Sequence, residues 1–178
     1  MLMKILLLGG SGFLGSGVQE QLAAKKLSVK SLDISDFDLA DSKASASLVA
    51  ELEDVDCIAV LAAKLGIKLF AESPVSAATA NHAIDQNVLA ALKAASKKYS
   101  KKYNVTYFSS SELYGSMKSE NDLISDTTEY NFNIPTDRQL YAKMKYEAEV
   151  AFKDELDSED SALNFFKVLR PFNVYGKN

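Results

Sequence analysis

Apolar and polar residues alternate along the chain in blocks that predict strands and helices in turn. Short apolar runs without polar alternation are typical of parallel strands covered on both faces. Longer stretches with apolar residues three and four positions apart predict helices with one buried stripe. The predicted strands cover 5–8, 27–33, 56–63, 105–109 and 163–170, and the predicted helices cover 16–26, 77–102, 140–156 and a segment beginning at Asp41 or Ser42. This order predicts an α/β protein with a doubly wound parallel sheet.

The first predicted strand ends in a glycine-rich turn. Gly10, Gly12 and Gly15 satisfy the pattern GxGxxG, and Gly9 begins a second match, GxxGxxG. Such glycines let the backbone turn sharply and approach a pyrophosphate, which would sit on the free N–H groups of the following helix. Glycines also cluster in ordinary tight turns. The strand before this turn and the helix after it favour dinucleotide binding.

An acidic residue, Asp33, ends the second predicted strand and lies eighteen residues after Gly15. This spacing is close to the roughly 20 residues that separate a glycine turn from the carboxylate that binds an adenosine ribose. A 2′-phosphate would be repelled by Asp33 and would require an arginine, but the sequence between Gly15 and Asp33 has none. We therefore expect NAD rather than NADP. The alternative is a solvated acid at the end of a strand.

Polar residues cluster after the fourth predicted strand. Ser110 to Gly115 (SSELYG) follows this strand, and ligands of open parallel sheets bind at the carboxyl ends of strands. The polar stretch 116–138 is predicted to be a surface loop over the site, and its length is typical of lids and binding loops. Asn87, in the middle of the helix predicted at 77–102, either points to solvent or bonds backbone near the site.

Composition and charge narrow the classes of function. The chain has 178 residues, of which 47% are hydrophobic and 25% charged, so we expect one domain spanning 1–178. A net charge of −4, with no long basic run, disfavours nucleic acid and anionic membranes as partners. We expect a small-molecule ligand instead.

Cysteine and histidine are scarce. The one cysteine excludes an internal disulfide, and the one histidine disfavours both a His-rich metal site and a Ser-His-Asp hydrolase. We therefore expect no metal. No apolar stretch reaches the roughly 18 residues of a membrane span, and the chain begins directly on a strand, so we expect a cytoplasmic protein.

Several spaced motifs together resemble a known family. The motifs GGSGFLG, Asp33, LAA, SSELYG, Tyr141-x-x-x-Lys145 and RPFNVYG occur in the order seen in extended short-chain dehydrogenase/reductases, the NAD-dependent epimerase/dehydratase family. The resemblance covers essentially the whole chain. It implies a Rossmann fold, NAD, a nucleotide-sugar substrate and a homodimer. Members of the family normally continue well past RPFNVYG into a substrate-binding lobe, so we expect that lobe to be missing from this chain.

The resemblance also implies two sets of site residues. The implied catalytic residues are Ser110, Glu112, Tyr141 and Lys145. The implied cofactor-binding residues are Gly9, Gly12, Phe13, Leu14, Gly15, Asp33, Asp38, Leu39, Leu61, Ala62, Ala63, Tyr141 and Lys145.

In the chemistry implied by the family, Tyr141 removes the hydroxyl proton of a sugar while hydride leaves its carbon. A phenol titrates near 10, so a phenolate at neutral pH requires its pKa to fall by about three units. One neighbouring cation usually lowers a pKa by about one to three units. Lys145, one turn away, would therefore need help from the positive charge of oxidised nicotinamide. Ser110 would hydrogen-bond the reacting oxygen.

The reaction that follows oxidation depends on Glu112. Its position matches the glutamate of nucleotide-sugar 4,6-dehydratases and UDP-glucuronate decarboxylases, which tilts the prediction from epimerase toward those reactions. An acid that faces solvent or caps a turn is the alternative. We therefore predict an NAD-dependent nucleotide-sugar epimerase or dehydratase that acts through a transient 4-keto sugar. The rival hypothesis is a non-catalytic NAD-binding sensor or scaffold, or an inactive truncated fragment.

Overall fold

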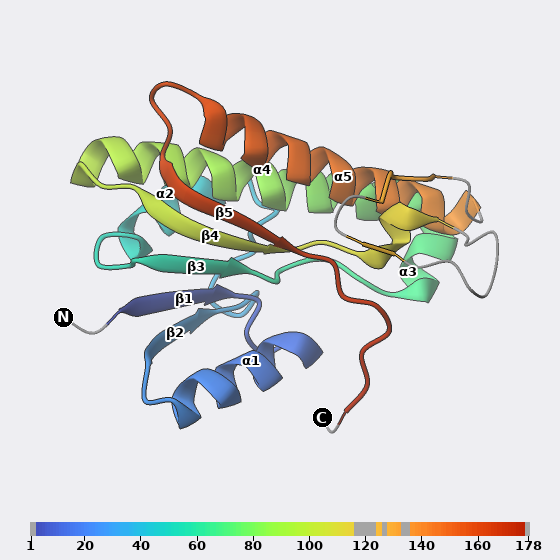
Figure 1. The fold of residues 1–178 in the computed structure, drawn as a ribbon, viewed down its shortest axis with the longest axis horizontal. Helices are drawn as coiled ribbons and strands as arrows, with labels where there is room; N and C mark the ends of the chain where they lie inside the picture. Colours follow the sequence, from blue (N-terminus) through green and yellow to red (C-terminus); the bar gives the residue numbers. More distant parts are fainter. Residues whose placement is uncertain (1–2, 116–123, 126–127, 133–135, 177–178) are drawn as a thin grey trace.

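The computed structural model describes residues 3–115, 124–125, 128–132 and 136–176. Within these residues the chain forms a parallel sheet of five strands in the order β2-β1-β3-β4-β5 (Figure 1). The strands are β1 (Lys4–Leu8), β2 (Ser28–Leu32), β3 (Cys57–Val60), β4 (Tyr103–Phe108) and β5 (Leu163–Leu169). The predicted α/β class with a parallel sheet is confirmed.

Helices cover both faces of this sheet, as Figure 1 shows. One face carries α1 (Phe13–Ala24), and the other carries α2 (Ala44–Glu51), α4 (Pro74–Tyr99) and α5 (Thr136–Asp157). Two short elements follow strand ends, namely α3 (Ile67–Glu72) after β3 and the 3₁₀ helix η1 (Ser111–Tyr114) after β4. The uninterrupted apolar run of β1 matches this arrangement, because Leu6, Leu7 and Leu8 are fully buried.

The order of the strands reverses next to β1. The chain leaves β1 to form β2 on one side, then returns to form β3 on the other side. In open parallel sheets, ligands bind in the crevice outside the carboxyl ends of strands at such a reversal. The crevice between β1 and β3 is therefore where the fold itself favours a ligand.

Several boundaries differ from the predicted ones. Helix α1 begins at Phe13 rather than at residue 16, so the glycine turn leads directly into it. Helix α4 begins at Pro74, where a proline at the first helical position loses no hydrogen bond. It ends at Tyr99, because the capping residue Ser100 has a φ of 52°, in the left-handed region, and stops the helix before the predicted residue 102.

Two further differences lie near the site. Strand β3 ends at Val60, so the residues that follow it lie outside any helix or strand instead of ending the strand at residue 63. Helix α5 begins at Thr136, inside the stretch predicted to be a loop. Most of that stretch (116–123, 126–127 and 133–135) lies outside the described residues, so the prediction of a lid stays a prediction.

Candidate functional site

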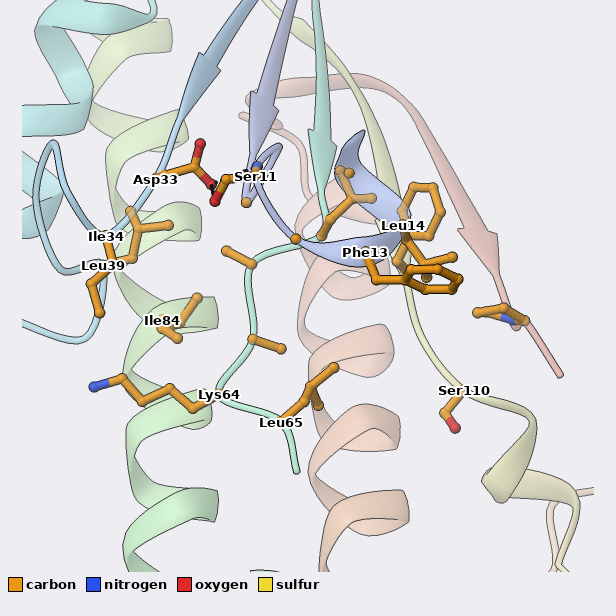
Figure 2. A pocket seen from close by; sticks show the side chains of 18 of the residues that line it. Ser11, Phe13, Leu14, Asp33, Ile34, Leu39, Lys64, Leu65, Ile84 and Ser110 are labelled. Carbon is orange, nitrogen blue, oxygen red and sulfur yellow. Dashed lines mark hydrogen bonds between the residues drawn. The ribbon is translucent and has the colours of Figure 1, made fainter. Parts of the chain in front are cut away.

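A cleft of about 710 Å³ lies outside the carboxyl ends of the strands, at the point where the strand order reverses. Figure 2 shows that its side chains come from the ends of several strands and from the glycine turn. All the residues predicted for the site line this cleft except Glu112. They are Gly9, Gly12, Phe13, Leu14, Gly15, Asp33, Asp38, Leu39, Leu61, Ala62, Ala63, Ser110, Tyr141 and Lys145.

The glycines of the turn have different physical roles. Gly9 has a φ of +88°, and a Cβ on it would lie 2.8 Å from the Cα of Ala62. A Cβ on Gly15 would lie 2.2 Å from the carbonyl oxygen of Gly9. These two glycines are required by the packing of the turn itself. Gly12 is different, because a Cβ there would meet nothing closer than 3.5 Å, so its open face is free for a ligand.

The N-terminus of α1 opens into the same cleft. Gly12 is its N-cap, with no side-chain hydrogen bond capping the first turn, and Phe13, Leu14 and Gly15 line the cleft. The first N–H groups of a helix lack partners within the helix and carry a partial positive charge. This end of α1 therefore suits an anionic group such as a pyrophosphate.

Asp33 is held in place by three hydrogen bonds. Its Oδ1 accepts from the backbone N–H of Ser11 at 2.9 Å and from the Ser11 hydroxyl at 2.8 Å (Figure 2). Its Oδ2 accepts from the Ser31 hydroxyl at 3.0 Å. Burial acts to raise the pKa of Asp33, but these hydrogen bonds outweigh it and hold the pKa below its usual value. The carboxylate keeps accepting capacity for a further donor. Sequence reasoning missed Ser11 and Ser31.

Beyond Asp33 the cleft wall is apolar. Ile34, Leu39 and Ile84 lie together at this end in Figure 2, and all three line the cleft. At its edge the Lys64 ammonium is 3.0 Å from the Asp38 carboxylate, and both side chains are more than one-third exposed. Hydrogen bonds from the backbone of Ala40 and from Lys64 lower the pKa of Asp38.

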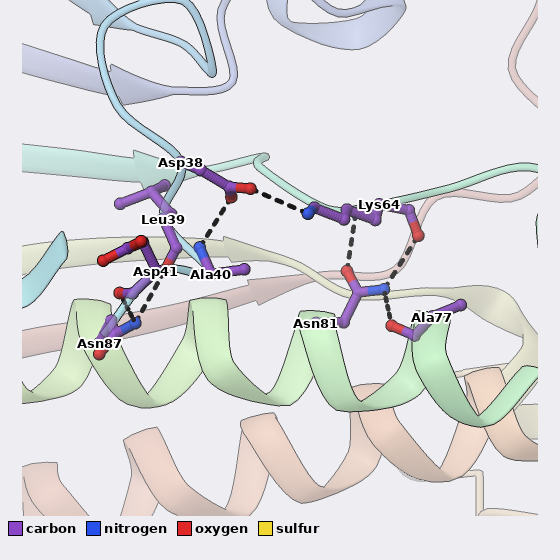
Figure 3. Close-up of polar contacts among 8 residues, drawn as sticks. All are labelled: Asp38, Leu39, Ala40, Asp41, Lys64, Ala77, Asn81 and Asn87. Atoms are coloured by element: carbon purple, nitrogen blue, oxygen red, sulfur yellow. Dashed lines mark hydrogen bonds and ion pairs between the residues drawn. The ribbon is translucent and has the colours of Figure 1, made fainter. Parts of the chain in front are cut away.

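Two asparagines of α4 fasten the loops of this end to the helix (Figure 3). The Asn87 side-chain amide donates to the carbonyl oxygens of Leu39 at 2.8 Å and Asp41 at 2.9 Å. Of the two interpretations of Asn87, bonding to backbone near the site is therefore confirmed. Asn81, which sequence reasoning missed, accepts from the Lys64 N–H at 2.8 Å and donates to the Lys64 carbonyl oxygen at 2.9 Å.

Tyr141 and Ser110 lie together at the other end of the cleft. The Tyr141 ring packs edge to face on Phe70 of α3, with ring centroids 5.4 Å apart. The Ser110 hydroxyl accepts from the backbone N–H of Glu112 at 3.2 Å and hydrogen-bonds with Tyr141. Burial raises the pKa of Tyr141, and the hydrogen bond with Ser110 opposes this effect. Neither α3 nor the role of Phe70 was predicted.

Lys145 is buried, with 4% of its surface exposed. Its ammonium donates to the Tyr107 hydroxyl at 3.1 Å and to the Phe108 carbonyl oxygen at 2.9 Å. Burial lowers the pKa of Lys145, while the negative charges of Asp85 and Glu149 act in the opposite direction. Sequence reasoning assigned Lys145 to cofactor binding and to lowering the pKa of Tyr141, and it missed these partners.

Glu112 lies beside the cleft rather than in its lining. It is part of η1, shortly after Ser110, and its carboxylate pairs with the Arg138 guanidinium at 3.0 Å. The side chain of Glu112 is 27% exposed. This pairing is a second use for the acid, and the role of Glu112 in proton abstraction stays a prediction.

A half-buried arginine supports the same end of the cleft. Arg170, directly after β5, donates to both carboxylate oxygens of Glu149, at 3.0 and 2.7 Å. It also donates to the Tyr114 hydroxyl at 3.0 Å and to the Tyr130 hydroxyl. These bonds join the segment after β5 to α5 and η1. The motif RPFNVYG contains Arg170, but no signal in the sequence identified its partners.

Comparison with protein families gives one match over nearly the whole chain. Residues 5–178 match the NAD dependent epimerase/dehydratase family. No curated protein matches the chain. Among the described helices, none combines the length and the apolar composition needed to cross a bilayer.

Solved structures share this fold at low sequence identity. The chain is similar to the UDP-glucose 4-epimerase of Thermus thermophilus in complex with NAD (TM-score 0.76, 23% identity, 94% of this chain and 54% of that one). It is similar to the Brucella ovis UDP-glucose 4-epimerase in complex with NAD (0.76, 23%, 96% and 52%). It is also similar to RMD from Pseudomonas aeruginosa complexed with NADPH (0.74, 26%, 96% and 54%). The chain therefore spans about half the length of each of these proteins.

Proposed function

Because the chain belongs to the NAD-dependent epimerase/dehydratase family, we propose that it binds NAD in its cleft and oxidises a nucleotide-activated sugar to a transient 4-keto sugar. The observation that supports this most is the lining of one cleft by a glycine turn, Asp33, Ser110, Tyr141 and Lys145. These groups come from elements that are far apart in the sequence.

The described residues fit a dinucleotide. The open face of Gly12 and the uncapped start of α1 suit the pyrophosphate. The ionised Asp33 suits a ribose hydroxyl and would repel a 2′-phosphate, which favours NAD over NADP. The apolar wall at Leu39 and Ile84 suits the adenine. When bound, NAD supplies the hydride acceptor.

Oxidation of the sugar also requires a base that removes the proton of its hydroxyl group. In our proposal the Tyr141 phenolate takes the proton of the sugar hydroxyl, and Ser110 donates a hydrogen bond to the reacting oxygen. Burial raises the pKa of Tyr141 in this structure, so the phenolate needs added positive charge. This requirement supports a base that works only beside oxidised nicotinamide.

The fate of the 4-keto sugar separates an epimerase from a dehydratase. A dehydratase needs a base for the proton at C5, and Glu112 would supply it only after leaving Arg138. Glu112→Gln should therefore abolish elimination but leave oxidation of the sugar intact. An epimerase would keep its activity within about threefold, because Glu112 would then have only a structural role.

Binding of NAD is tested by calorimetry on a matched pair of variants. Gly12→Ala adds a methyl group that the protein accommodates, so the fold should persist while affinity for NAD falls at least about tenfold. Gly17→Ala adds the same group on α1, where a Cβ meets nothing within 4 Å, and should bind NAD like the wild type. Equal affinities for the two variants would contradict the placement of the pyrophosphate.

Turnover is tested with NAD and a panel of UDP-, GDP-, CDP- and dTDP-sugars. We expect one sugar to be altered, with transient formation of NADH. Binding of NAD without any altered sugar would instead support the rival, a non-catalytic NAD-binding domain.

A further inference from the structure

An acidic side chain lies buried behind the catalytic end of the cleft. Asp85, on α4, is 6% exposed and has no assigned part in the proposed chemistry. Its Oδ2 accepts from the Tyr107 hydroxyl on β4 at 3.1 Å. A buried carboxylate without compensation is costly, so its surroundings should show what stabilises it.

Tyr107 connects this carboxylate to Lys145. The Tyr107 hydroxyl donates to Asp85 and at the same time accepts from the Lys145 ammonium at 3.1 Å. That ammonium also lies 4.5 Å from the centre of the Tyr107 ring. The three side chains come from α4, β4 and α5, so the fold builds one continuous chain of contacts through the protein interior.

The charges around Asp85 identify its partner. Burial raises the pKa of Asp85 to about 6, and the charge of Lys145, the hydrogen bond from Tyr107 and the charge of His82 oppose this rise. From α5, Tyr141 and Glu149 face the same interior, and neither of them brings a positive charge. Among these opposing effects, the charge of Lys145 is the largest positive influence on Asp85.

We propose that Asp85 is the counter-charge of Lys145, linked to it through Tyr107, and acts as a positioning residue for the Tyr141–Lys145 pair. The role assigned to that pair rests on the proposed function, but the contacts do not. Without Asp85 the buried ammonium would lose the negative charge that helps it stay protonated. The Tyr107 hydroxyl then helps to fix where the ammonium lies.

The coupling also has a consequence for the base. The negative charge of Asp85 raises the pKa of Tyr141, so this carboxylate keeps Lys145 charged but opposes formation of the phenolate. Because of these two effects, activity should depend on the ionisation of Asp85. In Asp85→Asn we therefore expect the rate of sugar oxidation to depend on pH in a different way. Replacing a merely structural residue would lower the rate by the same factor at every pH.

The direct test is the titration of Asp85, followed by NMR of labelled aspartate and assigned with Asp85→Asn. In Lys145→Met the buried carboxylate loses its cation, so we expect its acid dissociation constant to fall at least about tenfold. Lys143→Met removes an exposed lysine from the same helix and should leave this constant unchanged. Tyr107→Phe removes one hydrogen bond and should lower the constant by a smaller factor.

A second measurement covers the case in which Lys145→Met does not fold. The Lys145 ammonium, followed by NMR of labelled lysine, should lose its proton more easily in Asp85→Asn, again by about tenfold, because coupling between two sites is reciprocal. Equal titration in wild type and variants, or an Asp85 that stays protonated above neutral pH, would overturn the inference. Neither titration needs NAD or sugar. Failure to bind NAD would therefore remove the proposed function and leave the coupling intact.

Discussion

The two ends of the cleft are built in different ways. The end proposed for the dinucleotide (the dinucleotide end) consists of a glycine turn, a helix terminus and carboxylates near the surface, and its ion pair between Asp38 and Lys64 is more than one-third exposed. The end proposed for catalysis (the catalytic end) depends on side chains from separate elements, and there Asp85 and Lys145 are 6% and 4% exposed. Charges cost little at the first end and much at the second. The difference teaches that local backbone shape forms one end, whereas tertiary packing forms the other.

The largest expected effect is the loss of sugar oxidation when only the catalytic end is changed. Tyr141→Phe should lower the rate of sugar oxidation by at least about 100-fold, the usual worth of a general base, and leave the affinity for NAD within about threefold. Rates with the accepted nucleotide sugar and calorimetry with NAD measure the two parts. Tyr175→Phe removes the hydroxyl of a residue that is 94% exposed and should keep full activity. A Tyr141→Phe variant with the wild-type rate would remove Tyr141 from the chemistry.

The next effect shows the cost of burying charge at the catalytic end. The pKa of Asp85 is about 6 in the folded protein, whereas its ordinary value is 3.8. Between pH 3.8 and 6 the folded state therefore binds more protons than the unfolded state. Stability is therefore lost as pH rises from about 4 through 6, by up to about 3 kcal/mol. Urea unfolding should show this decline in the wild type but not in Asp85→Asn. Parallel pH dependence in the two proteins would contradict the assignment.

A third change probes the backbone shape of the dinucleotide end. Gly15→Ala places a Cβ 2.2 Å from the carbonyl oxygen of Gly9, and overpacking of this kind costs about 1–3 kcal/mol. Gly17→Ala, on the same helix in open space, should instead gain up to about 1 kcal/mol. The free energies of unfolding of the two variants measure the difference. A stable Gly15→Ala would show that the turn is looser than the structure indicates.

The smallest effect concerns the exposed ion pair. Lys64→Met removes the partner of Asp38, and exposed pairs contribute less than about 1 kcal/mol. The same substitution at Lys145 removes a buried cation and should lower the free energy of unfolding far more, because it leaves a buried carboxylate unpaired. Unfolding of Lys64→Met at low and high salt checks this, because salt screens only the exposed pair strongly. If Lys64→Met lost as much stability as Lys145→Met is expected to lose, the contrast between the two ends would be contradicted.

The residues predicted for the dinucleotide end do gather in one cleft, because their signals are local, and their role in binding NAD stays a prediction. The run of leucines in β1, the glycine turn and the acid after β2 each reflect neighbouring residues, and the structure gathers them in one cleft. The parallel sheet followed from the same periodicity. Boundaries were less accurate, since helix ends such as Ser100 depend on single backbone angles.

The catalytic end was predicted only in part. The family pattern gave Ser110, Tyr141 and Lys145, which share the cleft. It gave no sign that Tyr107 would contact both Asp85 and Lys145, because those contacts join positions 22 and 38 residues apart only after α4 and α5 pack on the sheet. It also implied a catalytic role for Glu112, which stays a prediction, but it did not show that this carboxylate pairs with Arg138.

The most direct test of the central claim compares the pKa of Tyr141 with oxidised and with reduced cofactor. Ring-labelled tyrosine, assigned with Tyr141→Phe, reports this pKa by NMR in the presence of NAD⁺ or of NADH. If the positive ring of NAD⁺ lies beside the base, the pKa of Tyr141 should be lower with NAD⁺ than with NADH, by about one unit or more. The same pKa with both forms would contradict a Tyr141 that acts as the base next to nicotinamide.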